Sequence, residues 1–235
     1  MMNCNDYDAI TFDVYGTLID WEPVILAMLG RWMKARNVST DDAALLESFD
    51  RARAHYQSLA PAWPYPRILR AAYAYIANER DLDIEPDEQL AFGQSAGDWP
   101  PFPDSVRALA QLRKRFVLGA LTNMDDASFA RSHALLDDCF DVVVTAERAG
   151  AYKPSLRHFV LGLTDLAARK IPPQRVLHVA QSLRADVRPA NLLGQDVVWI
   201  DRAGRGLGQK GFGAELAVPM VTFPTVEAFA SAFLG

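Results

Sequence analysis

The chain has 235 residues, half of them apolar and 23% charged, and its 24 basic and 29 acidic side chains give a formal charge of −5. This composition is typical of a globular protein and, without a run of Lys or Arg, argues against a nucleic-acid or anionic-membrane surface. Two cysteines, an acidic N-terminus and the lack of any apolar run of about 18 residues predict a cytoplasmic protein without a disulfide framework, signal peptide or membrane span.

The first predicted element is a short buried strand over residues 9–12, where the sequence is apolar and partly β-branched. It ends at Asp13, and the turn former Gly16 and the hydroxyl of Thr17 follow. Open parallel α/β sheets place their sites at the carboxyl ends of strands, and a glycine lets backbone N–H groups approach an anion. Asp13 can therefore serve as a nucleophile that forms an ester, although the same residues also fit a strand-end aspartate that caps a turn.

The next part of the chain changes character, because apolar residues recur at helical spacing and the alternation typical of strands is missing. A proline-rich break at 60–66 separates the predicted helices, and the Gly- and Pro-rich stretch 97–103 is expected to be the exit linker. We expect an all-helical cap of about four helices over residues 19–100, inserted into a core formed by residues 1–18 and 101–235.

Helix and strand patterns alternate from Asp104 onward. The expected strands cover residues 116–121, 142–145, 176–180, 197–200 and 220–223, and the expected helices cover 104–112, 125–136, 155–168, 186–193 and 225–233. This alternation predicts an α/β fold with a doubly wound parallel sheet. The glycine-rich stretch 202–213 is expected to form an irregular surface loop near the carboxyl edge of that sheet.

Polar residues follow several of the predicted strands, namely Asp13, the pair Thr122 and Asn123, Lys153, and Asp186. If the strands are parallel, all of these residues share one rim of the sheet. Taken singly, each has a simpler explanation: a turn former, a solvated loop charge or a helix cap. Their order, one after another along the strands, is harder to obtain by chance, so we expect a site at this rim.

The order of these residues resembles that of the haloacid dehalogenase-like hydrolase superfamily and, within it, of the L-2-haloacid dehalogenase branch. The resemblance covers essentially the whole chain. It rests on the motifs FDVYGTL at 12–18, LTN at 121–123, YKP at 152–154, and AQS at 180–182 followed by Asp186 and Gly194. It implies a Rossmann-like core with a helical cap over the site, which agrees with the predicted elements.

The resemblance implies an enzyme that cleaves the carbon–halogen bond of small 2-haloacids. Asp13 would attack the halogen-bearing carbon, and Lys153 would keep Asp13 ionised. Thr17 would help to hold carboxylates, and Asp186 would position or activate the water that cleaves the ester. The implied substrate-binding residues are Val14, Tyr15, Thr122, Asn123, Ser182 and, as the cap arginine that receives the halide, Arg51, with Arg53, Arg67 and Arg70 as competing arginines.

Two positions in these motifs bear on metal binding. The phosphatases of the superfamily have a general acid where this chain has Tyr15 and a carboxylate where it has Gln181. Mg²⁺ prefers anionic oxygen ligands, so both changes disfavour phosphate-ester hydrolysis, whereas a halide leaves without a proton. The resemblance therefore implies a reaction on a small molecule without metal or other cofactor. The oligomeric state that we consider for this chain is a homodimer.

Further departures from the dehalogenase pattern leave the substrate and halogen open. The pattern has Ser at Thr122 and Tyr at Phe159, so this chain lacks one hydroxyl group. A phosphatase or phosphonatase-like hydrolase that uses Asp13 with Mg²⁺ is the alternative enzyme, and a binding protein that kept the fold is the non-catalytic alternative. His178, inside an apolar strand, is interpreted as a core residue.

Overall fold

Six strands form one parallel sheet in the computed structural model, which describes residues 3–202 and 213–235. The strands are β1 (Ala9–Phe12), β2 (Val117–Leu121), β3 (Val142–Val144), β4 (Val176–Ala180), β5 (Asp196–Ile200) and β6 (Val221–Phe223). Their order across the sheet is β3-β2-β1-β4-β5-β6, and each neighbouring pair is parallel. The predicted doubly wound parallel sheet is therefore confirmed.

β1 lies at the centre of the sheet, and its sequence explains this position. All its residues are buried, as expected for a parallel strand covered by helices on both faces. Ile10 lies opposite Leu118 of β2 and Leu177 of β4. Pairing on both sides brings the carboxyl ends of β1, β2 and β4 to one edge, so the residues that follow these strands lie close together.

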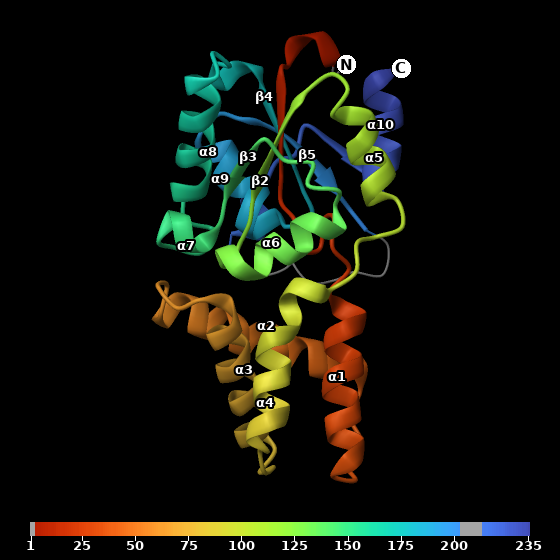
Figure 1. The fold of residues 1–235 in the computed structure, drawn as a ribbon, viewed down its shortest axis with the longest axis vertical. Helices are drawn as coiled ribbons and strands as arrows, with labels where there is room; N and C mark the ends of the chain where they lie inside the picture. Colours follow the sequence, from red (N-terminus) through yellow and green to blue (C-terminus); the bar gives the residue numbers. More distant parts are fainter. Residues whose placement is uncertain (1–2, 203–212) are drawn as a thin grey trace.

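The predicted helical insertion lies between β1 and α5 (Ser105–Leu112), the helix that precedes β2, and contains four α-helices in the described chain. They are α1 (Glu22–Ala35), α2 (Asp42–Leu59), α3 (Tyr65–Glu79) and α4 (Pro86–Gln94). Asp41 starts α2 by accepting a hydrogen bond from Ala44 N–H at 3.0 Å. Figure 1 shows the insertion at one end of the sheet and both termini at the opposite end, so the carboxyl edge of the sheet faces the insertion.

The other helices cover the two faces of the sheet. They are α5 (Ser105–Leu112), α6 (Asp126–Leu135), α7 (Ala146–Ala149), α8 (Arg157–Ala168), α9 (Arg188–Leu192) and α10 (Val226–Leu234). One apolar cluster joins Phe12 to α5, α6 and α10 and continues into the insertion, where the ring centroids of Trp32 and Tyr73 lie 4.5 Å apart. A second cluster packs Phe159 and Leu166 of α8 against the other face.

Trp99 connects the insertion to the sheet. Its ring is buried and meets Tyr15, which follows β1, at 5.7 Å and Tyr65, on α3, at 6.3 Å between centroids. Asp20 N–H donates to Pro100 O at 2.8 Å, so the two chain segments that enter and leave the insertion lie side by side. The domain boundaries inferred from the sequence stay a prediction.

The helix after β4 differs from the predicted one, which was to start at Asp186. The chain instead forms a π-turn, η4 (Leu183–Val187), and then α9. Ser182 Oγ accepts a hydrogen bond from Ala185 N–H at 3.0 Å and thereby caps the segment before the predicted start. Asp186 consequently lies within a helical turn and its side chain is buried.

Two predictions concern other parts of the chain. Most of the predicted glycine-rich loop, residues 203–212, lies outside the described residues. Over the residues that are described, no helix combines the length and the apolar character needed to cross a bilayer.

Asp104 joins the end of the sheet to the core helices. Its Oδ1 accepts from Arg202 Nη1 at 2.7 Å, and its Oδ2 accepts from Val226 N–H at 2.9 Å, at the start of α10. Arg202 Nη2 also donates to Thr17 O at 2.6 Å. Burial alone would raise the pKa of Asp104, but the hydrogen bond and charge of Arg202 outweigh it and lower that pKa. The ionised carboxylate therefore stabilises this corner of the fold.

We predict that Asp104→Asn destabilises the protein by about 3 kcal/mol at neutral pH, because buried Arg202 loses its counter-ion. The folded-state pKa of Asp104 is lowered, so its stabilisation is complete above the unfolded value of 3.8 and is lost as pH falls through the folded value. The difference in urea midpoint between wild type and variant should therefore shrink in acid. Asp98→Asn is the control, because that side chain is 71% exposed, and it should change stability by less than about 0.5 kcal/mol. A pH-independent difference for Asp104→Asn would contradict the prediction.

Candidate active site

The turn after β1 carries Asp13 and holds its carboxylate from one side. Thr17 Oγ1 donates to Asp13 Oδ2 at 2.6 Å and accepts a hydrogen bond from Gln181 N–H at 2.8 Å. Gly16 makes the turn possible, because its φ of +99° lies in the region that favours glycine. These contacts join the turn after β1 to the segment after β4 around one carboxylate.

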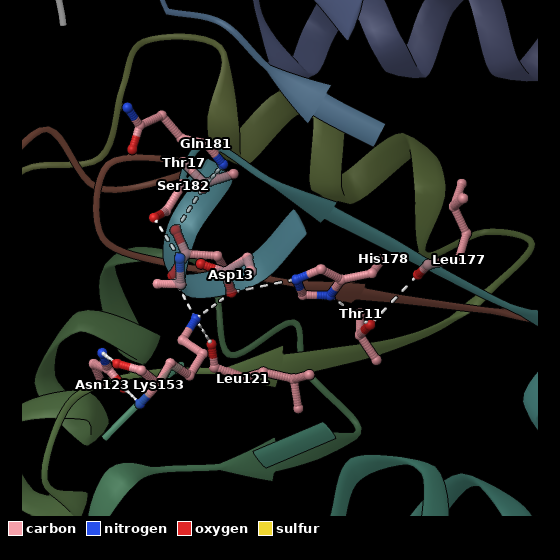
Figure 2. A network of polar contacts seen from close by, with 12 residues as sticks. Thr11, Asp13, Thr17, Leu121, Asn123, Lys153, Leu177, His178, Gln181 and Ser182 are labelled. Atoms are coloured by element: carbon pink, nitrogen blue, oxygen red, sulfur yellow. Dashed lines mark hydrogen bonds and ion pairs between the residues drawn. The ribbon is translucent and has the colours of Figure 1, made fainter. Parts of the chain in front are cut away.

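Lys153 occupies the centre of the site, with its ammonium group between two carboxylates. Figure 2 shows it beside Asp13. Its Nζ donates to Asp13 Oδ1 at 2.9 Å, to Asp186 Oδ1 at 2.6 Å and to Leu121 O at 2.7 Å. An ammonium group has three hydrogens, so all of them are used. Asn123 fixes the backbone of this lysine: its Oδ1 accepts from Lys153 N–H at 2.6 Å and its Nδ2 donates to Lys153 O at 3.2 Å.

His178 approaches Asp186 from inside the sheet, on β4, and Figure 2 shows its ring near Thr11. Its Nε2 lies 3.3 Å from Asp186 Oδ1, and its Nδ1 lies 2.9 Å from Thr11 Oγ1 on the neighbouring strand β1. A proton on Nε2 satisfies the carboxylate, and Nδ1 then accepts from the threonine hydroxyl. His178 is buried, as its interpretation as a core residue required, but its contact with Asp186 was missed. A polar threonine at the paired position Thr11 was the available signal.

The three charged groups at the centre of the site shift each other's ionisation. Burial and the charge of Asp186 raise the pKa of Asp13, and Lys153 opposes them. Burial would also raise the pKa of Asp186, but the charge of Lys153 and the His178 hydrogen bond outweigh it and lower that pKa. The two carboxylates outweigh burial and raise the pKa of Lys153. The charge of Lys153 thus favours the ionised form of both carboxylates.

A cavity of about 70 Å³ lies against these groups, between the sheet edge and the insertion. Two groups of residues line it. The core contributes Asp13, Tyr15, Asn123, Met124, Lys153, Gln181, Ser182, Arg184, Ala185 and Asp186, and the insertion contributes Trp21, Asp50, Arg53, Gln57 and Tyr65. Its size suits an organic acid of a few heavy atoms, and its polar lining suits a charged one. The site can therefore present a buried carboxylate to a small anionic molecule.

Most of the predicted site residues lie at this cavity. Its lining includes Asp13, Tyr15, Asn123, Lys153, Ser182 and Asp186, and Thr17 holds Asp13. Val14 and Thr122 are buried and are not among the lining residues found in the described chain. Val14 O accepts hydrogen bonds from the N–H groups of Leu18 and Ile19, so this residue holds the turn together. Thr122 Oγ1 has no hydrogen-bond partner within the described residues.

The structure does not place Arg51 at the cavity, which corrects the prediction for this residue. Arg51 is 55% exposed and donates to Glu79 at 2.7 Å on the outer side of the insertion. Two residues further along α2, about 200° around the helix, Arg53 lines the cavity. Its guanidinium pairs with Asp50 and lies 5.6 Å from the ring centroid of Trp21. Arg53, one of the competing arginines, is therefore the one that the fold turns towards Asp13.

The donor groups of the site fit a divalent cation poorly. Mg²⁺ needs several hard oxygen ligands in an octahedron, usually anionic ones. Asp13 and Asp186 both bind the ammonium group of Lys153, and the nearby Gln181 contributes a neutral amide. Within residues 3–202 and 213–235, no cluster of three or more His, Cys, Asp or Glu side chains could hold a metal ion.

Known proteins resemble this chain over nearly its whole length. Residues 7–194 match the family model of the haloacid dehalogenase-like hydrolases. Haloacetate dehalogenase H-2 of Moraxella sp. (strain B) is 25% identical over 221 residues, which cover 91% of this chain and 94% of that protein. The (S)-2-haloacid dehalogenase of Xanthobacter autotrophicus is 30% identical over 222 residues, which cover 88% of this chain and 79% of that protein.

A solved structure shares the fold. It is that of L-2-haloacid dehalogenase from Xanthobacter autotrophicus with chloropropionic acid covalently bound. The two chains are 20% identical and superpose with a TM-score of 0.76 over 96% of this chain and 97% of the other. The predicted core with an inserted helical part is thus a known architecture.

We predict that Lys153→Met lowers the free energy of unfolding by about 4 kcal/mol near pH 7, because two buried carboxylates lose their shared cation. Protonation of one carboxylate relieves their repulsion, so the destabilisation should diminish as pH falls towards 5. Urea unfolding at several pH values measures both effects. Lys114→Met, at an exposed lysine, is the matched control and should match wild type within about 0.5 kcal/mol. A fully stable Lys153→Met protein at pH 7 would refute this account of the site.

Proposed function

The chain belongs to the haloacid dehalogenase-like hydrolase family, and we propose that it hydrolyses the carbon–halogen bond of small 2-haloacids through an ester on Asp13. The observation that carries this proposal is a carboxylate, Asp13, at the wall of a cavity of about 70 Å³ and 2.9 Å from the ammonium group of Lys153. Relatives named haloacetate dehalogenase and (S)-2-haloacid dehalogenase support the choice of substrate class.

In the first step, an Asp13 oxygen attacks the halogen-bearing carbon from the side opposite the halogen. A new carbon–oxygen bond forms, and the carbon–halogen bond breaks with its electron pair on the halide. The halide leaves as an anion, so no general acid is required at Tyr15. The Tyr15 hydroxyl donates to Ser132 at 2.6 Å instead, and its ring serves as a wall of the cavity.

Arg53, and not Arg51, is the arginine of the insertion that we propose to bind the halide. It lines the cavity from the insertion, and its Nε has no hydrogen-bond partner within the described residues. A guanidinium N–H that is buried and unpaired favours a departing anion. We therefore propose that Arg53 receives the halide, while Asp50 keeps the guanidinium in place.

In the second step, water attacks the side-chain carbonyl carbon of the Asp13 ester. The bond between that carbon and the ester oxygen breaks, the hydroxy acid leaves with an oxygen of Asp13, and one proton is released overall. We propose that Asp186 positions this water. Lys153 and His178 hold its Oδ1, and its Oδ2 has no hydrogen-bond partner among the described residues, so it is available to accept from water.

The remaining predicted residues have supporting roles in this proposal. The backbone N–H groups of Tyr15 and Asn123 and the Ser182 hydroxyl are the groups we propose to contact the substrate. The N–H of Thr122 donates to Val144 O at 2.9 Å, so this residue supports the strand end instead. The amide of Asn123 already binds the backbone of Lys153, so this residue mainly positions the lysine. The cytoplasmic location and the homodimer stay predictions from the sequence.

The alternative activity is that of a phosphatase or phosphonatase-like hydrolase using Asp13 with Mg²⁺. The donor groups around Lys153 and the neutral Gln181 count against it, because they offer few anionic oxygens to a divalent ion. Measuring halide release in the presence of EDTA, as described next, separates the two activities.

Halide release from 2-chloropropionate should occur with the purified protein and should persist in EDTA, because no step requires a divalent ion. In ¹⁸O-water, many turnovers should add mass to the peptide that contains Asp13 and not to peptides that contain Asp20 or Asp186. A single turnover with enzyme in excess should give hydroxy acid whose new oxygen is unlabelled, since that oxygen comes from Asp13. Ion-selective detection and mass spectrometry provide the readouts.

Two outcomes would decide against this mechanism. Activity that EDTA abolishes and Mg²⁺ restores, together with rapid hydrolysis of p-nitrophenyl phosphate, would favour the phosphatase. Label in the first hydroxy acid, with none in the Asp13 peptide, would make Asp13 a general base instead of a nucleophile.

Arg53→Ala should reduce kcat for halide release by roughly 100-fold or more, as when one preorganised charge-stabilising donor is lost. Arg51→Ala on the same helix is the matched control and should retain near wild-type rates, since that side chain points to solvent. Steady-state halide release measures both, and thermal unfolding checks that both variants fold. The opposite ranking of the two variants would show that the insertion turns its other face to the substrate.

A further inference from the structure

Arg184 is a guanidinium in the cavity wall that the mechanism above does not use. It lies on η4, two residues before Asp186, and it is half-buried. Within the described residues it makes no hydrogen bond or ion pair. An arginine that faces a cavity without a counter-ion is unusual, because withdrawing its charge from water is unfavourable unless something pairs with it.

The other two cations of the cavity, Lys153 and Arg53, already bind groups of the protein. Lys153 Nζ donates its three hydrogens to Asp13, Asp186 and Leu121 O. Arg53 pairs with Asp50. Neither Lys153 nor Arg53 is thus fully available to a second anion, and Lys153 has no hydrogen left to donate.

The net charge of the cavity lining also indicates that Arg184 favours an anion. Its lining holds three acids, Asp13, Asp50 and Asp186, and three bases, Lys153, Arg53 and Arg184. Without Arg184 the lining would carry one net negative charge and would repel an organic anion. With it the lining is neutral, and the positive charge without a partner is the one on Arg184.

We propose that Arg184 binds the carboxylate of the substrate, and that the cavity thereby selects 2-haloacids over uncharged halogen compounds. This inference rests on the proposed function and adds a specificity-determining residue to it. Ser182 caps the turn that carries Arg184, so the same contact that places Asp186 also places the guanidinium. A carboxylate bound there would lie between η4 and the insertion, with its neighbouring carbon on the side of Asp13.

The electrostatic surroundings agree with an anion at this position. Burial and the nearby Arg53 charge lower the pKa of Arg184, while Asp50 and Asp186 act in the opposite direction from a distance. A guanidinium remains protonated at neutral pH in such surroundings, because its ordinary pKa is far above 7. A bound carboxylate would relieve both unfavourable contributions, since it would replace lost hydration and screen Arg53.

The experiment compares wild type with Arg184→Met, which removes the charge, and Arg184→Lys, which keeps it. Arg184→Gln is a second neutral variant in case the methionine protein does not fold, and Arg157→Met, at an exposed arginine of α8, is the control. Propionate, which has no halogen and cannot react, is the binding probe, and calorimetry gives its Kd. Halide release from 2-chloropropionate and from neutral 2-chloropropionamide gives KM and kcat.

The neutral variants should bind propionate roughly 10- to 100-fold more weakly, the range expected for a charge-assisted hydrogen bond. Their KM for 2-chloropropionate should rise by a similar factor with little change in kcat, and their activity on the amide should not change. Arg184→Lys should be intermediate, and Arg157→Met should match wild type.

The outcomes separate this inference from the proposed function. Unchanged propionate binding in folded neutral variants overturns the role of Arg184, even if wild type releases halide. Arg184-dependent propionate binding without halide release from any 2-haloacid supports the anion site and overturns the proposed dehalogenation. An equal loss of activity on the acid and on the amide also overturns the inference, because it would mean that Arg184 acts on structure and not on the substrate charge.

Discussion

The buried ammonium group of Lys153 brings together parts of the chain that are far apart in sequence. It reaches Asp13 after β1, the carbonyl of Leu121 at the end of β2 and Asp186 after β4. Two buried carboxylates this close would repel each other strongly, and a shared cation allows both to stay near one cavity. The parallel pairing of β2, β1 and β4 makes the arrangement possible, because it aligns their carboxyl ends at one edge.

The cavity depends on the insertion as much as on the sheet. The sheet edge supplies Asp13 and Lys153, whereas α2 supplies the ion pair of Arg53 and Asp50. Trp99 holds the two parts together by packing against Tyr15 and Tyr65. A low-dielectric space with fixed charges results, in which an anion is stabilised more strongly than in water.

The sequence predicted the groups whose positions follow from strand order, since parallel strands must bring Asp13 and Lys153 to one rim. It could not predict which arginine of α2 enters the cavity. Arg51 and Arg53 lie on opposite sides of that helix, and only its packing on the core decides which side faces inward. Arg184 was missed because it lies in a π-turn whose early start at Ser182 changes the direction of the following side chains.

One face of α2 forms a wall of the cavity that is separate from the sheet edge. Asp50, Arg53 and Gln57 line the cavity from this single helix at spacings of three and four residues. Asp13 and Lys153 lie at the edge of the sheet, outside the insertion. A substitution at Gln57 would therefore reshape this wall of the cavity without removing a contact that Asp13, Lys153 or Arg53 makes.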